Sequence, residues 1–587
     1  MTWKMENPQA FESEKIRWEA VPYLRGLGLD IGCGPCKVLP HVIGIDNRAD
    51  VAMFNIPMNP DMTVPDGSEL PMYADNSMKF VYSSHLLEHL VDYKKALKEW
   101  WRLVEVGGYM ILYLPHKDLY PNIHVGKDTP IPDVKKWMLE HGYDKPDAFS
   151  VLELAKERTA LGAKTIGEQY AGSSAANQDH KHDFLPKDII NAMKEIGESW
   201  SLLQNQDRNK DMEYSFFQVF QKTDDGKQRQ PWTNPKPKKT AGICRYGAIG
   251  DIIQTGSIAQ ALKAEGYHVT LFCEPRGLEI AKHDPSYDAF VVQDKDQVPN
   301  AELGPFWDYW GQRFDRWINL SESVEASLLA LPDRMASRWP LTMRRKHLDH
   351  NYLEWMHDIA ETNYAWFKEG QRFVCTKEEK EWAKAERAKI DGTCILWPLA
   401  GSSVHKRWAG GVWQLKIDGK EGEITGFDTI IGRLIAATDS TVVMVGDKTC
   451  QILEEPWNNS ERVWKRSGKW TIRETLAFAQ ATDVVIGPET GVLNSVAFMD
   501  MAKIVFLSHS SVNNLTRDWK NTHSLITENT PCYPCHMMHY EAKTCHMQKH
   551  GEALCQKNIH FDTVWNALCR VIPIEHFTMK DKRLVGE

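Results

Sequence analysis

Short apolar runs separated by polar, helix-length segments recur along most of the chain. Residues 27–31 form one such run, which leads into a glycine-containing turn at residues 32–34, and residues 42–46 form the next. The run that begins at Ala241 leads in the same way into a turn at residues 245–251. Further runs lie at residues 269–273, 290–292, 317–320, 394–397, 441–445, 483–486 and 503–507. This alternation predicts the α/β fold class, with several domains built on parallel sheets.

One polar stretch divides the chain. Residues 222–240 contain three prolines and follow neither a helical nor a strand period, which is typical of a linker. A helix-rich, charged stretch at residues 349–390 precedes a third set of strands. We therefore predict domains at residues 1–222, 241–390 and 391–587, with a linker at 223–240.

Composition limits the class of protein. The 587 residues are 42% hydrophobic and 25% charged, and the mean hydropathy is −0.46, as expected for a soluble protein of three or four globular units. No apolar run is long enough for a transmembrane segment, and the first residues lack the apolar core of a signal peptide, so we expect a cytoplasmic protein. The net charge of −9 and a pI near 6.2 count against a broad nucleic-acid surface, although a local basic groove remains open.

The first glycine turn has the residues of a nucleotide site. The glycines of Asp30-Ile-Gly-Cys-Gly34 let the backbone approach a ligand, and Asp46 ends the next strand, where an acid can bind ribose hydroxyls. Residues 66–71, 75–89 and 101–114 then follow in an order that resembles the motifs of class I S-adenosylmethionine-dependent methyltransferases, over about residues 15–222. The resemblance implies a Rossmann-like domain and S-adenosylmethionine as cofactor. It assigns cofactor contacts to the turn, to Asp46 and to the segment that contains Ser68: Asp30, Gly32, Cys33, Gly34, Asp46 and Ser68.

Three titratable residues lie at the end of the segment 75–89. His85, Glu88 and His89 stand where this fold often places groups near the transferred methyl, and a neutral imidazole can act as a base. His85 is our catalytic candidate, whereas packing explains Glu88 and His89 equally well. Pro35 and Cys36 depart from the family pattern, which puts the shape of the cofactor loop in doubt. Residues 120–177 fall where acceptor-binding elements usually lie in this family.

The second glycine turn carries an acid. Asp251 ends Arg245-Tyr-Gly-Ala-Ile-Gly-Asp251, where it either points into a cleft or caps a helix. Together with residues 397–408, 442–447 and 483–494, this turn resembles the heptosyltransferase-like glycosyltransferase family 9, over about residues 241–570. The resemblance implies the GT-B pair of Rossmann-like domains and sugar transfer with inversion from a nucleotide diphosphate. It makes Asp251 the base that takes the proton of the acceptor hydroxyl.

The same resemblance implies a site for the nucleotide-diphosphate sugar. Positive charge and backbone donors suit a diphosphate leaving group, and serine hydroxyls can add to them. The candidates are Ser402, Ser403, Lys406, Asp447, Glu489, Thr490, Gly491 and Val492. Glu489 replaces an aspartate of the common family pattern, and Asn494 stands near a position that is often histidine, so the choice of donor stays open.

The late cysteines allow two interpretations. Twelve cysteines are too sparse for a disulfide scaffold, but Cys532, Cys535, Cys545 and Cys555 have a spacing that can bind zinc. Buried reduced thiols are the alternative.

Two resemblances in one chain indicate a bifunctional transferase. We predict methyl transfer and inverting glycosyl transfer in the assembly or modification of a glycan, such as a lipopolysaccharide-like surface polysaccharide, with a glycan or glycolipid acceptor. Two alternatives stay open: modification of DNA or a nucleobase, and a glycosyltransferase whose first domain only binds the acceptor.

Overall fold

The computed structural model describes residues 12–47, 52–53, 56–58, 60–117, 181–197, 199–208, 215–230, 239–321, 339–366, 370–401, 406–417, 420–536, 548–549 and 552–577. The chain forms two compact units. The first contains residues 1–236 and 293–310, and the second contains residues 237–292 and 311–587. Each unit is built on parallel-rich sheets, which confirms the predicted α/β class.

The first unit has one large sheet with the strand order β10-β8-β9-β7-β6-β1-β2-β5. The strands from β7 to β5 are parallel, whereas β9 runs antiparallel to both β7 and β8. Their bounds are β1 (Gly28–Ile31), β2 (Ile43–Asp46), β5 (Met62–Thr63), β6 (Met78–Ser84), β7 (Val104–Pro115), β8 (Trp200–Arg208), β9 (Ser215–Lys222) and β10 (Gln228–Arg229). A separate short pair joins β3 (Ala52–Met53) to β4 (Ile56–Pro57).

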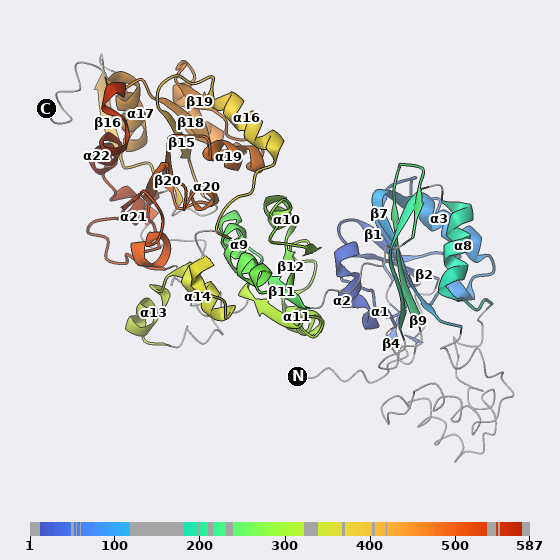
Figure 1. Cartoon of the computed structure of the whole chain (residues 1–587). Coiled ribbons are helices and arrows are strands. Elements are labelled where there is room, and N and C mark those ends of the chain that lie inside the picture. Colours follow the sequence, from blue (N-terminus) through green and yellow to red (C-terminus); the bar gives the residue numbers. More distant parts are fainter. Residues whose placement is uncertain are drawn as a thin grey trace. The chain divides into compact units, whose positions relative to one another are not determined.

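Helices cover both faces of this sheet (Figure 1). On one face lie α3 (Tyr93–Leu103) and α8 (Pro186–Ile196), and on the other lie α1 (Glu12–Lys15) and α2 (Arg17–Ala20). Helix α3 starts where Asp92 accepts a hydrogen bond from the Lys95 amide at 3.0 Å, and it buries Leu97 and Trp100 against the sheet. Part of the predicted linker forms a strand, because β10 pairs with β8 in parallel.

The first unit is completed by residues from the other side of the linker. Residues 293–310 lie in sequence between two strands of the second unit, yet they pack in the first, where α11 (Leu303–Gly311) begins. Phe306 is fully buried, and its ring meets that of Trp18 edge to face at 5.8 Å. The Gln297 side-chain amide donates to the carbonyls of Val21 (2.7 Å) and Leu24 (2.9 Å). The predicted domain boundaries themselves stay predictions.

The second unit contains two parallel sheets. The first has the order β13-β12-β11-β14 and the second β19-β18-β15-β20-β21-β22. Their strands are β11 (Thr240–Cys244), β12 (His268–Cys273), β13 (Ala289–Val292), β14 (Arg316–Asn319), β15 (Cys394–Pro398), β18 (Thr441–Val445), β19 (Val463–Lys465), β20 (Val484–Pro488), β21 (Ala502–Phe506) and β22 (Thr522–Leu525). Two hairpins, β16 (Val412–Ile417) with β17 (Lys420–Thr425) and β23 (Gln548–Lys549) with β24 (Glu552–Ala553), stand apart from these sheets.

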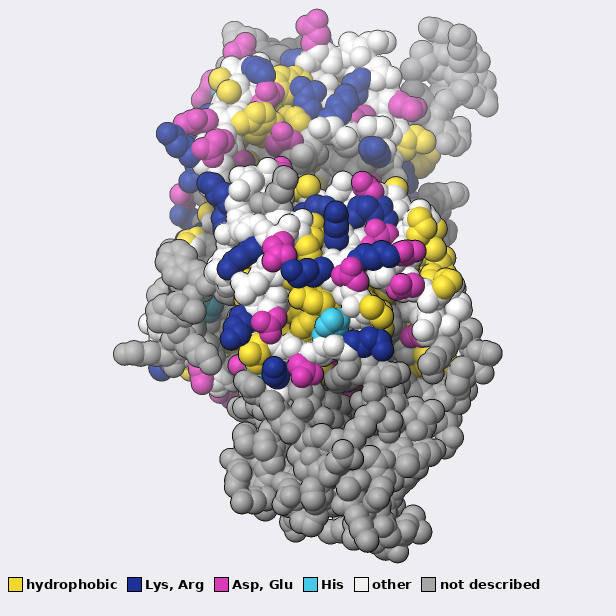
Figure 2. Space-filling model, turned by 90° about the vertical axis from the view of Figure 1, so that its right-hand side faces the viewer, with side chains coloured by type: hydrophobic (Ala, Val, Ile, Leu, Met, Phe, Trp, Pro, Cys, Tyr) yellow, Lys and Arg dark blue, Asp and Glu magenta, His cyan; other side chains and the backbone are white. Residues whose placement is uncertain are grey.

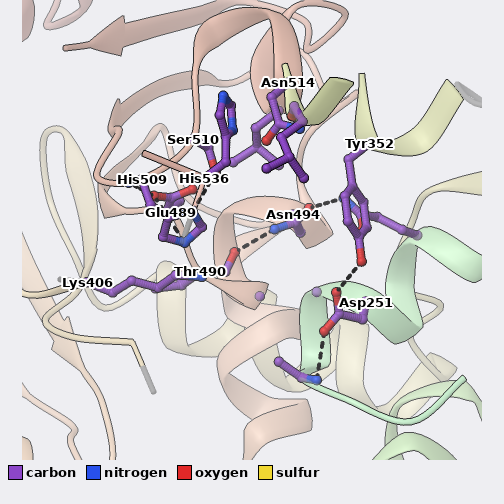
Figure 3. Close-up of a pocket in the computed structure, with 16 residues that line it drawn as sticks. Asp251, Tyr352, Lys406, Glu489, Thr490, Asn494, His509, Ser510, Asn514 and His536 are labelled. Carbon is purple, nitrogen blue, oxygen red and sulfur yellow. Dashed lines mark hydrogen bonds and ion pairs between the residues drawn. The ribbon is translucent and has the colours of Figure 1, made fainter. Parts of the chain in front are cut away.

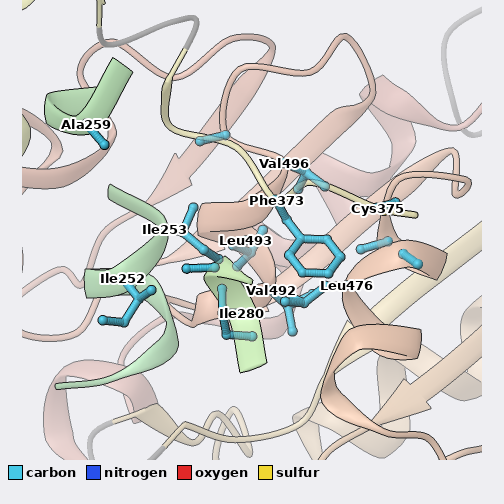
Figure 4. Close-up of a cluster of buried hydrophobic side chains, with 14 of the residues drawn as sticks. Ile252, Ile253, Ala259, Ile280, Phe373, Cys375, Leu476, Val492, Leu493 and Val496 are labelled. Atoms are coloured by element: carbon cyan, nitrogen blue, oxygen red, sulfur yellow. The ribbon is translucent and has the colours of Figure 1, made fainter. Parts of the chain in front are cut away.

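Helices lie between the parallel strands and after the last of them, as in doubly wound folds. They are α9 (Ile249–Ala264), α10 (Pro275–Ala281), α13 (Leu341–Leu348), α14 (Tyr352–Ile359), α16 (Lys377–Arg387), α17 (Gly426–Ala437), α18 (Gln451–Glu454), α19 (Ile472–Ala479), α20 (Gly491–Ser495), α21 (Leu554–Lys557) and α22 (Phe561–Val571). One apolar core includes residues of both sheets and their helices: Ile252 and Ile253 of α9 belong to it together with Leu493 of α20 and Leu476 of α19 (Figure 4). The first turn of α9 is thereby fixed next to α20.

Candidate functional site

A pocket of about 530 Å³ lies at the carboxyl ends of β1, β2 and β5. Its wall consists of the first glycine turn, the ends of these strands and the segment after β6: Ile31, Gly32, Ile45, Asp46, Asn47, Val64, Pro65, Asp66, Gly67, Ser68, Leu86, His89, Leu90, Val91, Asp92 and Lys95. Of the predicted cofactor contacts, Gly32, Asp46 and Ser68 line this pocket. Gly32 has φ 77°, and a Cβ there would lie 2.8 Å from the Leu86 side chain, so the position requires glycine.

Backbone donors orient two of the three acids in the wall of this pocket. The Asp46 carboxylate accepts hydrogen bonds from the amides of Gly34 (3.1 Å) and Asn47 (2.8 Å), which ties the glycine turn to the end of β2. Asp66 accepts a bond from the Ser68 amide at 2.8 Å. These carboxylates retain acceptor capacity for the hydroxyl and amino groups of a nucleoside.

Asp30 and Cys33 are buried and do not line this pocket. Asp30 is fully buried and accepts a hydrogen bond from the Val38 amide at 2.7 Å. Burial raises the pKa of Asp30 to about 7, the charge of Asp46 adds to this, and the bond from Val38 opposes it. Burial also raises the pKa of the Cys33 thiol far above its usual value. Both side chains therefore belong to the buried structure around the first glycine turn.

The structure places His85 away from the wall of this pocket. Its backbone is in the left-handed region (φ 49°), and its Nε2 lies 2.8 Å from the Ser215 hydroxyl of β9. Burial, and then the charges of Lys15 and His89, lower the pKa of His85 well below its usual value, so the imidazole is neutral. His89, one short helical turn later, lines the pocket instead. Glu88 between them is fully buried, and burial raises its pKa to about 8.

A second pocket, of about 330 Å³, lies in the second unit (Figure 3). Elements of both halves of that unit form it: Ala248, Gly250, Asp251, Gln254, Leu348, Tyr352, Lys406, Glu489, Thr490, Gly491, Asn494, His509, Ser510, Asn514, Leu515 and His536. Asp251 and Tyr352 lie at one end of this set, and Lys406 and Glu489 lie at the other (Figure 3).

Asp251 is held by three groups. Its Oδ2 accepts a hydrogen bond from the Ala248 amide at 2.8 Å, which also closes the start of α9. Its Oδ1 lies 2.9 Å from the guanidinium of Arg245 and accepts a bond from the Tyr352 hydroxyl at 3.5 Å. The Arg245 side chain is 1% exposed, whereas that of Asp251 is 27% exposed. Asp251 therefore does both things that the sequence left open: it stabilises the start of α9, and it also faces the pocket.

The opposite wall combines a buried acid with cationic groups. Burial alone would raise the pKa of Glu489, but the charges of His509 and Lys406 and hydrogen bonds from Ser508 and Ser510 hold it well below its usual range. The His509 Nε2 lies 3.8 Å from the Glu489 carboxylate. Glu489 is therefore ionised, and it organises the side chains around the end of β20.

Helix α20, which follows β20, connects this wall to α9. The Asn494 side chain donates to the Thr490 carbonyl at 3.0 Å and accepts bonds from the amides of Gln254 and Gln371, each at 3.3 Å. Gly250 lies directly against it, since a Cβ there would be 3.0 Å from the Asn494 amide nitrogen. Asn494 therefore has a structural role between the two halves of the second unit.

Val492 and Asp447 do not line this pocket. Val492 belongs to the apolar core beside Ile252, and only its backbone can face a ligand. Asp447 is exposed after β18, where it accepts a bond from the Thr449 amide at 2.9 Å. Ser402 and Ser403 lie outside the described residues. Sequence reasoning missed Gln254, Tyr352, His509, Asn514 and His536, none of which belongs to a recognisable motif.

Zinc binding by the late cysteines stays a prediction. Cys532, Cys535 and Cys555 lie in the described part of the second unit, whereas Cys545 lies outside the described residues. Among the residues that the structure describes, no group of three or more His, Cys, Asp or Glu side chains is placed to hold a metal ion.

Charged side chains of both signs are mixed on the surface. On the face of the molecule in Figure 2, Lys and Arg side chains are interspersed with Asp and Glu. Ion pairs such as Lys94–Glu195 link α3 to α8 in this way. Within the described ranges, no helix combines the length and apolar character needed to cross a membrane.

Comparison with known proteins gives a family match for part of the chain. Residues 29–112 match the family described as "Methyltransferase domain", which confirms the predicted resemblance for the segment that forms the first pocket. No curated protein matches the sequence.

Three solved structures are similar in fold to parts of this chain. A glycosyl transferase family 9 protein from Veillonella parvula is 14% identical, with a TM-score of 0.41, over 57% of this chain and 97% of that one. The ADP-heptose lps heptosyltransferase II of E. coli is 12% identical, with a TM-score of 0.39, over 57% of this chain and 98% of that one. A SAM-dependent methyltransferase from Thermotoga maritima is 16% identical, with a TM-score of 0.22, over 36% of this chain and 88% of that one. The chain is thus similar to a methyltransferase domain in its first part and to family 9 glycosyltransferases over a larger part of its length.

Proposed function

We propose that the protein is a bifunctional transferase, in which the second unit transfers a sugar from a nucleotide diphosphate with inversion and the first transfers a methyl group from S-adenosylmethionine. The observation that carries this proposal is the second pocket. It holds a partly exposed carboxylate, Asp251, at one end and the cationic side chain of Lys406 at the other. These are the two groups that the reaction needs, separated by space for a substrate.

The carboxylate is suited to act as a base. Asp251 takes the proton of the acceptor hydroxyl while that oxygen bonds to the anomeric carbon. The bond between this carbon and the phosphate oxygen breaks, and the nucleoside diphosphate leaves with the electron pair, so the anomeric configuration inverts. Arg245 and Tyr352 hold one carboxylate oxygen at 2.9 and 3.5 Å, which fixes the direction of the acid toward the pocket.

The leaving group needs stabilisation at the other end. Lys406 supplies positive charge to the diphosphate as the bond breaks. The hydroxyl oxygen of Thr490 is buried and has no hydrogen-bond partner among the described residues, so it is free to bind a phosphate oxygen. The ionised Glu489 carboxylate accepts a hydrogen bond from the Ser508 amide at 2.9 Å, and it thereby fixes the end of β20 next to Thr490.

The first pocket fits S-adenosylmethionine. When bound, this cofactor supplies an electrophilic methyl group. In this assignment Asp46 binds the ribose hydroxyls, Asp66 and Ser68 lie against the adenine, and the backbone at Gly32 faces the methionine end. His85 stays our candidate for the base: its neutral imidazole suits that role, but the acceptor must reach it beside Ser215.

Both activities on one chain suggest a shared product. We propose a glycan or glycolipid acceptor, of the kind used in surface polysaccharide assembly, and a cytoplasmic site of action. Modification of DNA or a nucleobase is the rival, and it requires DNA binding that weakens steeply as salt increases.

Thermal unfolding of the full chain with ligands tests both sites. S-adenosylhomocysteine and one of ADP, UDP, GDP, CDP or dTDP should each stabilise the protein, by about 2.7 kcal/mol when the ligand is at 100 times its Kd. Lys406→Ala should remove the stabilisation by the nucleotide, and Asp46→Asn should remove the stabilisation by S-adenosylhomocysteine. The exposed Lys469→Ala and Asp224→Asn variants serve as matched controls. Absence of any shift with the unaltered protein would contradict the proposal.

A further inference from the structure

The chain just after Lys406 makes a tight turn. Gly410 and Gly411 both have left-handed backbones, with φ values of 68° and 87°. A Cβ at Gly410 would lie 2.5 Å from the Trp408 ring, so this turn requires glycine at that position. Successive amides in such a turn point toward one side and form a concave site for an anion.

The carboxylate of Glu552 fills this concave site. Its Oε1 accepts hydrogen bonds from the amides of Ala409 (2.6 Å) and Gly410 (3.0 Å), and the residue is only 4% exposed. Burial raises the pKa of Glu552, whereas the amides of residues 409–411 and the charge of Arg407 act in the opposite direction. A second bond from the same part of the chain runs from the Trp408 indole to the Ile559 carbonyl at 3.0 Å.

Lys406 is therefore enclosed between two fixed points. On its N-terminal side, the Gly401 amide donates to the Lys406 carbonyl at 2.8 Å, and Ala400 forms a bridge with Arg407. On its C-terminal side, the turn held by Glu552 begins three residues later. Lys406 itself lines the second pocket between these two points.

We propose that Glu552 is a positioning residue for the phosphate-binding side of the second pocket. It acts through the glycine turn on Lys406 and does not line the pocket itself. This inference rests on the proposed function, since it assigns to Lys406 the role of binding the diphosphate. Loss of the Glu552 carboxylate frees the turn, so binding of phosphate groups weakens while binding of the nucleoside part is retained.

The test measures phosphate binding and nucleoside binding separately in the full chain. Calorimetry with ADP, UDP, GDP, CDP and dTDP first identifies the nucleotide that the unaltered protein binds, and the corresponding nucleoside is then compared with it. Glu552→Ala should weaken the nucleoside diphosphate about tenfold or more, because two hydrogen bonds to a charged acceptor are lost. The nucleoside should change by less than about twofold. Glu552→Gln keeps an acceptor oxygen and should restore most of the affinity, and the exposed Glu461→Gln variant is the matched control.

The outcomes separate the two proposals. Equal loss of nucleoside and nucleotide binding in Glu552→Ala, or an unchanged nucleotide affinity, overturns the positioning role. Should Glu552→Ala fail to fold, Trp408→Phe removes the indole bond to Ile559 together with part of a buried ring that stacks on Trp397, and it should still weaken nucleotide binding more than nucleoside binding, by about threefold. Failure of the unaltered protein to bind any of the five nucleotides overturns the proposed function itself, and this inference with it.

Discussion

Removal of the Phe306 ring should destabilise the N-terminal unit, although this residue lies beyond the linker in the sequence. Phe306 is fully buried among Ile16, Ala20 and Val21 of the first unit, and its ring contacts Trp18. A Phe→Ala change at a buried site costs about 3–5 kcal/mol. The groups around Phe306 have little freedom to fill the cavity that the ring leaves, because residues 16–21 also pack against buried residues of the sheet. We therefore expect a loss of about 4 kcal/mol.

The loss is a large part of the stability of one unit. Folded units are stable by about 5–15 kcal/mol, and for units of this size each kcal/mol lowers the melting temperature by about 2–4 °C. Phe306→Ala should lower the transition of the first unit by about 8–16 °C and leave that of the second unit in place. Calorimetry can assign the transitions, because S-adenosylhomocysteine is expected to raise only the first.

Two variants of the same segment control this experiment. Lys295→Ala changes an exposed side chain and should shift neither transition, while Phe306→Leu fills most of the space and should cost less than about 1.5 kcal/mol. A shift of less than about 2 °C for Phe306→Ala, or a shift confined to the second transition, would refute the packing of residues 293–310 in the first unit.

Three further predictions follow from the two pockets. Asp251→Asn should lower glycosyl transfer about 10²- to 10⁴-fold and leave nucleotide stabilisation unchanged, as measured with the donor that the nucleotide identifies; retained activity would exclude the base assignment. Gly32→Ala should abolish stabilisation by S-adenosylhomocysteine, because its Cβ meets Leu86 at 2.8 Å, whereas Gly34→Ala, with the same left-handed backbone but open space, should keep part of it. Asp30 has its pKa raised from 3.8 to about 7, so the folded protein binds one proton more than the unfolded chain between these values. Stability should therefore fall as pH rises through this window, by up to about 1.4 kcal/mol per pH unit, and Asp30→Asn should flatten the profile in denaturant titrations; an unchanged profile would contradict the raised pKa.

The strands were predictable because each fully buried parallel strand needs a continuous apolar run. Residues 441–445 and 269–273 were predicted as strands, and they correspond to β18 and to all but the first residue of β12. Glycine turns after such strands are also visible in the sequence, since few other residues adopt the backbone of Gly32. Fold class and the general location of both pockets therefore follow from local pattern.

The orientation of individual side chains did not follow from local pattern. His85 and His89 stand in one motif, but the left-handed backbone at His85 directs its ring toward Ser215, and His89 faces the pocket. Tyr352 and His536 reach the second pocket from segments that are distant in sequence from Asp251. Such residues are brought together only by the packing of both halves of the second unit around one core.

In the segment 293–310, the sequence indicates a helix but does not indicate the surface against which that helix packs. Leu303, Phe306, Trp307 and Trp310 follow the i, i+3, i+4, i+7 spacing of a helix with one apolar face, yet nothing in that spacing identifies the surface that the face covers. The structure assigns it to the first unit. A fragment cut at the linker would therefore expose the apolar surface around Val21 and leave two carbonyls without the Gln297 amide. The linker separates the two sites in sequence. The N-terminal unit is nevertheless complete only when residues 293–310, which lie beyond the linker, are present.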